Sequence, residues 1–164
     1  MYRFCVAALA GPLLSATLAM AEPLPGELPV DPYEASNENA GAAPLENPDV
    51  FVAFHGQAGI DRIVDDLVDR VIVDPRIEGI FRASDLVRLR RTLKEQFCYL
   101  LGGPCDYTGR DMVEAHKDQG ITMREFNALV ESLQLAMDTE GVPFAMQNRL
   151  IAKLAPMQRD VVTR

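Results

Sequence analysis

The sequence is short of the residue types on which most catalytic and metal sites depend. Its 164 residues include no tryptophan, two histidines and three cysteines. The histidines, His55 and His116, lie far apart, and no C-x-x-C or H-x-x-x-H spacing indicates a zinc site. No order of serine, histidine and aspartate is typical of a hydrolase triad. Any chemistry that the chain supports therefore rests on very few side chains.

The sequence also lacks the patterns of a sheet and of a strongly basic binding face. No stretch of β-branched residues alternates with polar ones for the length of several strands. The formal net charge is −8, but residues 22–50 hold seven acidic residues and no basic ones. Without that segment and Arg3, 17 acidic and 15 basic residues remain. The rest of the chain is nearly neutral, so we expect no nucleic-acid partner.

Residues 1–21 have the pattern of a secretory signal peptide. Arg3 precedes an apolar stretch, and the tripeptide 19–21 (Ala-Met-Ala) is a cleavage site of the A-x-A type. A membrane anchor is the alternative, but Gly11 and Pro12 interrupt a stretch that is already short for a span. We therefore expect export, to the periplasm, and no stable membrane insertion of the mature chain.

The remainder divides into a tail and one domain. Residues 22–50 contain six prolines besides their seven acids, a composition that predicts a disordered tail. Residues 51–164 are long enough for a single domain, and their apolar residues recur at helical spacing throughout. The expected fold class is all-α. The spacing predicts long helices over about 60–72, 86–100, 123–140 and 143–161, the last one kinked at Pro156.

His116 is the most informative residue of the domain. It shares a face with Met112 and Ala115 on a short predicted helix that Asp111 caps and Gly120 ends. A histidine on a half-apolar helix face is often an ordinary core or surface residue, and that interpretation stays open from this pattern alone. The other interpretation is a metal ligand that points inward.

The order of motifs favours the ligand. From about 51 to 162 the chain resembles the group I truncated globins, in the order and spacing of these pieces: Asp74-Pro75-Arg76 to Ile80-Phe81, Arg88-Leu89, Leu101-Gly102-Gly103-Pro104, Tyr107-Thr108-Gly109, Ala115-His116-Lys117, Gly120-Ile121-Thr122, Phe126 and Ala155-Pro156. The resemblance implies a two-over-two helical sandwich that binds haem b. It also implies that His116 is the proximal iron ligand and that Phe81 packs flat on the porphyrin.

The expected distal side, opposite His116, departs from well-known members of that family. Where many have a tyrosine, this chain has Val68, and the two facing positions on the next long helix are Leu89 and Leu93. All three are aliphatic and cannot donate a hydrogen bond to a bound gas. Two further cofactor contacts are expected from the inward faces, Phe97 and Met112. Gln96 and Tyr99 are expected to face outward or toward a neighbouring helix, although either could reach the pocket.

Three functions follow as hypotheses. The first is a haem protein that binds a diatomic gas (O2, CO or NO) and is not itself an enzyme. The second is a haem enzyme for nitric oxide dioxygenation or peroxide turnover, which needs a polar distal group and a reductase partner that the sequence does not reveal. The third is a haem-free helical adaptor. Of the arginines and lysine on 88–94, most belong to a solvated helix face, but one could meet a haem propionate.

Cys98 and Cys105 are the two cysteines that remain after removal of the signal peptide. An exported protein meets oxidising conditions, and the Gly-Gly-Pro turn at 102–104 brings the two residues near each other. We expect a disulfide, worth about 2.5 kcal/mol in the chain-entropy model. Two buried thiols are the alternative.

Overall fold

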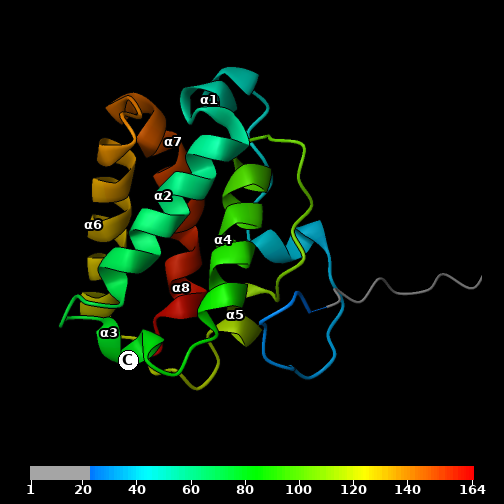
Figure 1. Cartoon of the computed structure of the whole chain (residues 1–164), viewed down its shortest axis with the longest axis vertical. Coiled ribbons are helices and arrows are strands. Elements are labelled where there is room, and N and C mark those ends of the chain that lie inside the picture. Colours follow the sequence, from blue (N-terminus) through cyan, green and yellow to red (C-terminus); the bar gives the residue numbers. More distant parts are fainter. Residues whose placement is uncertain (1–22) are drawn as a thin grey trace, which may run out of the picture.

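The computed structural model describes residues 23–164, so the expected signal peptide lies outside the described residues. Within the described range there are helices and loops but no strands, which confirms the all-α class. Figure 1 shows the two longest early helices, α2 and α4, beside each other, with α6, α7 and α8 around them. None of the helices of residues 23–164 is long and apolar enough to cross a membrane.

Helix α2 (Gly56–Val71) is the central element. One apolar stripe at helical spacing is fully buried, and it includes Ile60, Ile63 and Leu67. The helix packs against both α4 (Leu86–Leu100) and α6 (Met123–Thr139). It ends before Asp74-Pro75, as the sequence predicts, because a residue that precedes proline is disfavoured in helical conformation.

Side-chain caps define where α4 and α6 begin. Asp85 accepts hydrogen bonds from the backbone N–H groups of Val87 and Arg88 at the start of α4. At the start of α6, Thr122 and Glu125 form a capping box in which each side chain accepts from the other residue's backbone N–H. These caps were predictable from sequence since they depend on local residues only.

The last long helix is broken at Pro156. Helix α7 (Phe144–Leu154) passes into the 3-10 turn η2 (Ala155–Met157) and then into α8 (Gln158–Val161). Proline has no N–H for the helical ladder, so the predicted kink takes the form of a tightened turn. The four long helical segments α2, α4, α6 and α7–α8 make up the helical sandwich.

The helix that precedes His116 is shorter than predicted. Helix α5 comprises only Met112–Ala115, and His116 is its C-cap residue, with φ −113° and ψ 8°. Asp111 caps the helix as expected. Gly120 does not end it, because the chain has already left helical conformation by His116. Further upstream, the equally short α3 (Glu78–Phe81) carries Phe81.

The prediction of a disordered tail is wrong for residues 23–50. This segment lies along α4 and α5 (Figure 1) and contains the 3-10 helix η1 (Asn37–Ala40) and the start of α1 (Pro48–Ala53). Ala40 and Val50 are completely buried. Composition alone predicted disorder because the segment cannot form a core of its own, but side chains of the domain hold it in place. The expected domain boundary at residue 51 therefore falls inside α1.

Gly41 shows how closely this segment packs. Its φ of +84° is a conformation that favours glycine. A Cβ atom placed there would come within 2.8 Å of Met157 Cε and 3.3 Å of Met112 Cγ. The backbone at Gly41 thus rests directly on two methionines of the domain.

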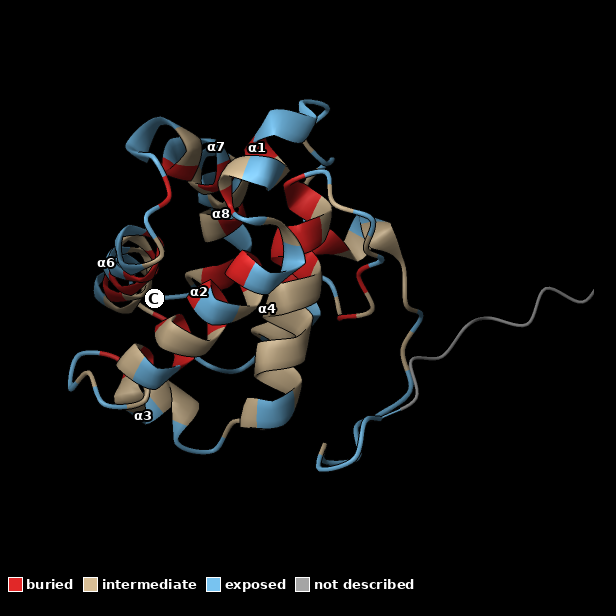
Figure 2. Cartoon of the chain, turned by 45° about the horizontal axis from the view of Figure 1, so that its top comes forward, coloured by how far each residue is buried: buried red, intermediate tan, exposed pale blue. Residues whose placement is uncertain are grey.

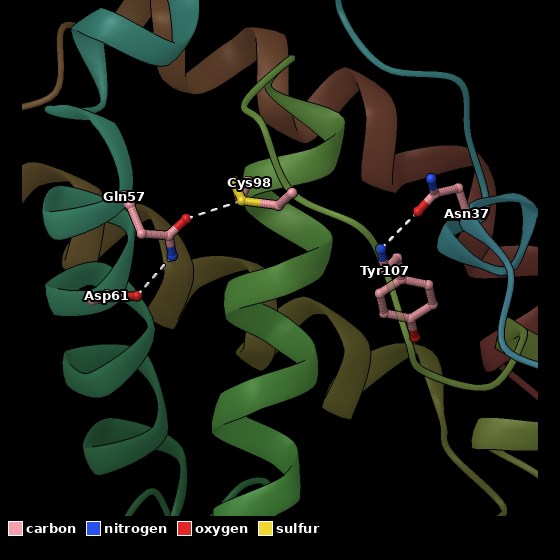
Figure 3. Close-up of a disulfide and its surroundings, with 6 residues drawn as sticks. Asn37, Gln57, Asp61, Cys98 and Tyr107 are labelled. Atoms are coloured by element: carbon pink, nitrogen blue, oxygen red, sulfur yellow. Dashed lines mark hydrogen bonds between the residues drawn. A yellow bond between two sulfur atoms is a disulfide. The ribbon is translucent and has the colours of Figure 1, made fainter. Parts of the chain in front are cut away.

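Cys98 and Cys105 form the expected disulfide, with their Cα atoms 5.9 Å apart. Figure 3 shows it beside Gln57 of α2, whose Oε1 lies 3.1 Å from Cys105 Sγ. A bridged sulfur carries no hydrogen, so this is a contact and not a donated bond. The bridge joins the end of α4 to the loop 101–111, which leads to α5 and His116.

Candidate functional site

A cavity of about 450 Å³ lies between α4, α5 and α6, and its wall is mainly apolar. Its size falls in the range of small-molecule and cofactor sites. The first half of α4 explains why it exists. In Figure 2 the end of α4 is buried while its beginning is only half-buried. Three leucines of that first half are only partly buried at the edge of the core, and two of them, Leu89 and Leu93, line the cavity; the third is Leu86.

His116 lines this cavity and brings a ring nitrogen to it. Its Nδ1 lies 2.8 Å from the backbone oxygen of Met112. A carbonyl oxygen can only accept, so Nδ1 carries the hydrogen and Nε2 carries the free lone pair. Burial lowers the pKa of His116, against a smaller opposite effect of the Met112 carbonyl. The ring is therefore neutral at pH 7, which is the form that binds a metal.

This hydrogen bond from the second ring nitrogen is one that iron- and zinc-binding histidines generally make. A ligand histidine usually donates its other N–H to a carbonyl or carboxylate, which fixes the orientation of the ring. Here the carbonyl belongs to Met112, at the beginning of α5, which is itself capped by Asp111. The position of the ring thus depends on backbone and not on a mobile side chain.

Most of the predicted cofactor contacts line the cavity. Phe81, Leu89, Leu93, Phe97 and Met112 all belong to its wall together with His116.

Val68 is the exception. It is fully buried and is not part of the wall, whereas its neighbour Leu67 is. Successive residues of a helix point about 100° apart, so α2 cannot turn both toward the cavity. The aliphatic character of this wall is unchanged, but the contributing residue differs from the prediction.

The hydroxyl groups of the cavity wall all donate hydrogen bonds to backbone carbonyl oxygens. Ser84 donates to Ile80 O, and Thr92 donates to Arg88 O at 3.0 Å. Tyr33 donates to Thr108 O, and Tyr107 donates to Arg110 O. Each hydroxyl has a single hydrogen. None of the four is available to donate to a molecule in the cavity without giving up a protein bond.

Gln96 does not face outward as expected. It is buried, lines the cavity and donates from Nε2 to the backbone oxygen of Ala40 at 3.0 Å. The second hydrogen of that amide is directed among the sulfurs of Met112 and Met157, at 3.7 and 3.8 Å. Gln96 therefore ties the cavity wall to the N-terminal segment. Tyr99 is absent from the wall, in agreement with the prediction.

Charged residues mark the side on which the cavity meets solvent. We call this side the mouth and define it by Asp85, Arg88, Arg110 and Glu114, together with Val30 and Tyr33 of the N-terminal segment. Arg88 Nε is buried and has no hydrogen-bond partner among the described residues. It lies 3.7 Å from Asp85 Oδ2, beyond hydrogen-bond distance.

These residues fit haem. An apolar cavity with one neutral imidazole nitrogen suits a macrocycle that brings its own four nitrogens to the iron. Among residues 23–164, no three histidine, cysteine, aspartate or glutamate side chains converge to hold a bare metal ion. The unpartnered Nε of Arg88 at the mouth is suited to a carboxylate, and haem has two.

His55 does not belong to the site. It lies at the N-terminus of α2 with φ +60°, and its Nδ1 is 2.8 Å from Glu140 Oε1. Arg62 binds the same carboxylate. It is a half-exposed residue at the start of a helix.

Sequence reasoning missed the part of the wall that the N-terminal segment supplies. Val30 and Tyr33 carried no recognisable signal, and neither did Arg110, whose guanidinium lies over the Tyr33 ring. The one available hint was the density of arginine on α4, two of which, Arg88 and Arg91, pair with Glu27 of that segment in addition to acidic residues of the domain.

Comparisons with known proteins agree with this geometry. Residues 49–163 match the family model described as bacterial-like globin. A group 1 truncated hemoglobin of Synechocystis sp. is 33% identical over 125 residues, which cover 70% of this chain and 98% of the relative. One from Mycolicibacterium paratuberculosis is 29% identical, with coverage of 72% of this chain and 87% of the relative.

Solved structures show the same fold. The truncated hemoglobin of Tetrahymena pyriformis in its Fe(III) form superposes with a TM-score of 0.67 at 24% identity. The match covers 70% of this chain and 98% of that one. The expected two-over-two sandwich is thereby confirmed. By sequence, by fold and by the family model, this chain belongs to the bacterial-like globins and, within them, to the group I truncated haemoglobins.

Proposed function

We propose that this haem-binding globin holds its iron through Nε2 of His116 and binds a diatomic gas on the opposite face of the haem, in a pocket that offers the gas no hydrogen bond. The observation that carries the proposal is the orientation of His116. Its Nδ1 hydrogen is bound by Met112 O, so the lone pair of Nε2 is left for a metal inside the cavity. Bound haem would supply the iron atom to which a gas can bind.

The cavity wall opposite His116 favours gas binding over enzymatic chemistry. Leu67, Leu89 and Leu93 are aliphatic, the hydroxyl of Thr92 donates within its own helix, and the amide of Gln96 donates to Ala40 O. A polar donor that would stabilise developing charge on a bound molecule is not available in that wall. We therefore place nitric oxide dioxygenation and peroxide turnover second. A haem-free adaptor would leave the neutral, oriented His116 without a role.

We further propose that the protein acts outside the cytoplasm, in the periplasm. The support comes from the signal-peptide pattern of residues 1–21 and from the Cys98–Cys105 bridge, which suits an oxidising compartment. Amino-terminal sequencing of the protein from a periplasmic fraction tests this. A mature chain that begins at Glu22 is the expected result, and retention of Met1 in the cytoplasmic fraction would contradict export.

The haem assignment is tested by His116→Ala, with His55→Ala as the matched control. We expect the wild type and the His55 variant to show a strong Soret band after reconstitution with haem. The His116 variant should lose most of its haem, and added imidazole should restore part of the band, because it can occupy the space that the ring leaves. A His116 variant with unchanged haem content and an unchanged ferrous spectrum would show that another group binds the iron.

A further inference from the structure

We infer that residues 23–34 form a strap that belongs to the haem site: it closes the mouth of the cavity, and a latch at Glu27 sets how fast haem leaves. This inference rests on the proposed function, because it concerns the retention of the same cofactor. It goes beyond it in assigning a role to a segment that lies outside the globin match, which begins at residue 49.

The strap contributes directly to the cavity. Val30 and Tyr33 are part of the wall at the mouth, beside Arg88 and Arg110. Val30 is 46% exposed, and so covers the cavity from the solvent side without being enclosed itself. Removal of these two side chains would leave the charged edge of the cavity open to water.

Glu27 is the first attachment. Its side chain is completely covered, and its carboxylate accepts from Arg91 Nε at 2.6 Å and lies 3.3 Å from Arg88 Nη2. The hydrogen bond from Arg91 is the main cause that lowers the pKa of Glu27. The neighbouring backbone is attached to α4 as well, because Leu28 N donates to Asp85 Oδ2 at 2.7 Å. Both arginines belong to α4, so Glu27 fastens the strap to the cavity wall.

Tyr33 is the second attachment. Its hydroxyl donates to Thr108 O at 2.8 Å, and the guanidinium of Arg110 lies over its ring, 5.0 Å from the centroid. Arg110 also donates from Nη2 to the backbone oxygen of Asp31 at 2.8 Å. The strap therefore spans the mouth from α4 to the loop in front of His116.

The strap has little else to hold it. Its only hydrogen bond between two backbone groups within the described residues runs from Glu27 N to Leu24 O, and its one further hydrogen bond with α4 is that from Arg88 Nη2 to Leu28 O at 2.5 Å. Leu24 and Leu28 are 49% and 60% exposed, so burial of apolar surface contributes little. A segment with these properties opens locally at low cost once its polar attachments are released.

The next residues of the chain provide a fixed base. Ala40 is fully buried, its carbonyl accepts from Gln96, and Leu45 N donates to Leu100 O at 2.9 Å. Residues 35–50 are thus tied into the core, while residues 23–34 are tied only to the surface of the mouth. This contrast places the hinge near residue 35.

Arg88 connects the strap to the cofactor. It lies near Glu27 through Nη2, and its buried Nε is unpartnered. A haem carboxylate at Nε would leave the pairing with Glu27 intact. One arginine could then hold the haem and the strap together, so that closing the strap and binding haem support each other.

The test uses the full chain and compares Glu27→Gln with Glu34→Gln. Glu34 lies in the same strap and carries the same charge, but it is exposed and has no ion pair among the described residues. Reconstituted proteins are mixed with an excess of haem-free myoglobin, and transfer of the Soret band is followed. We expect Glu27→Gln to lose haem about tenfold faster than wild type, and Glu34→Gln to lose it at the wild-type rate.

A second readout needs no haem. Amide hydrogen exchange of the haem-free proteins should be faster at Leu28 in Glu27→Gln than in wild type, because the latch that holds Leu28 N against Asp85 is weakened. Tyr33→Phe, which removes only the bond to Thr108 O, should show the same effects to a smaller degree.

The outcomes separate the two proposals. Faster exchange together with faster haem loss in Glu27→Gln supports the strap. Unchanged exchange would show that Glu27 is no latch, and faster exchange with unchanged haem loss would show that the strap does not retain haem; each overturns the inference while the haem assignment stands. A wild type that takes up no haem overturns the proposed function, and the inference with it.

Discussion

In the proposed haem site, the proximal side at His116 and the mouth of the cavity are held in different ways. On the proximal side, His116 is held by the carbonyl of Met112, four residues earlier in the chain. At the mouth, Arg88 and Arg91 are held by Glu27, and the attachment of Glu27 to Arg91 spans 64 residues. The side chain that we propose as the iron ligand is thus held by a local contact, whereas the strap that we propose as the cover of the mouth is attached through charges to a distant part of the chain. The comparison suggests that proximal geometry and access to the cavity can be changed separately.

The largest expected effect comes from a change that acts on both sides at once. The disulfide Cys98–Cys105 holds the loop 101–111, which carries Thr108 for the strap and leads to His116. Replacing both cysteines by serine should lower the free energy of unfolding by about 2.5 kcal/mol. Chemical denaturation of the haem-free protein measures this. Reduction of the wild type should reproduce the effect, and reduction of the double variant should have none.

The next largest effect is expected on the rate of oxygen release, from a change in the aliphatic wall that we propose lies opposite His116. Leu93→Gln places a donor on α4 where the wall is aliphatic, and it is a better test than a change at Val68, which does not line the cavity. A hydrogen bond to a ligand that carries partial charge is worth roughly 1–3 kcal/mol, so oxygen release should slow by about ten- to a hundredfold. Stopped-flow dissociation rates measure it. Carbon monoxide, which develops little charge, should be released at almost the same rate, and an equal slowing of both gases would contradict the argument.

Lowering the pH should weaken haem binding by His116 and the attachment of the strap through Glu27 in two different pH ranges. The pKa of His116 is lowered from 6.5 by burial, so haem binding should weaken as pH falls below 6.5 and the proton competes for the ring. The pKa of Glu27 is lowered from 4.5 by Arg91, so its pairing is complete above 4.5 and is lost as pH falls below that value. The rate of haem loss should therefore rise in two steps. In Glu27→Gln the step at lower pH should disappear; two unchanged steps in that variant would assign the second to another group.

The smallest effect is expected far from the cavity, at Glu140. Hydrogen bonds from Arg62, assisted by His55, lower its pKa to about 2. Stability from this cluster is present above pH 4.5 and is lost as pH falls toward 2. His55→Ala should lower the free energy of unfolding at pH 7 by less than about 1 kcal/mol, because His55 is half-exposed and Arg62 remains. Haem content should be unaffected, and a change in it would link this cluster to the cavity.

Sequence was a good guide wherever the determinants were local. The starts of α4 and α6 follow from Asp85 and from the Thr122–Glu125 capping box, and the break before α8 follows from Pro156. The inward position of His116 followed from the helix face that it shares with Met112 and Ala115. Its helix was overestimated because helical spacing over a few residues cannot tell a single turn from two.

Sequence was a poor guide where the partner is distant. Nothing local indicates that Gln96 binds the carbonyl of Ala40 or that Glu27 meets Arg91. The choice between Leu67 and Val68 depends on a rotation of α2 that is set by its packing against α4 and α6. An acidic, proline-rich stretch is disordered only if no surface offers it cations, and composition does not describe that surface.

The strap also has a consequence for the order in which the molecule is assembled. Glu27 and Tyr33 are made early, but their partners Arg91 and Thr108 follow 64 and 75 residues later. Such contacts form late in folding, since the intervening chain must first be closed into a loop. The cavity is therefore complete on its proximal and helical walls before its mouth is covered. If the strap closes the mouth as we propose, we expect newly made protein to pass through an interval in which the pocket exists and stands open, and haem to enter during that interval.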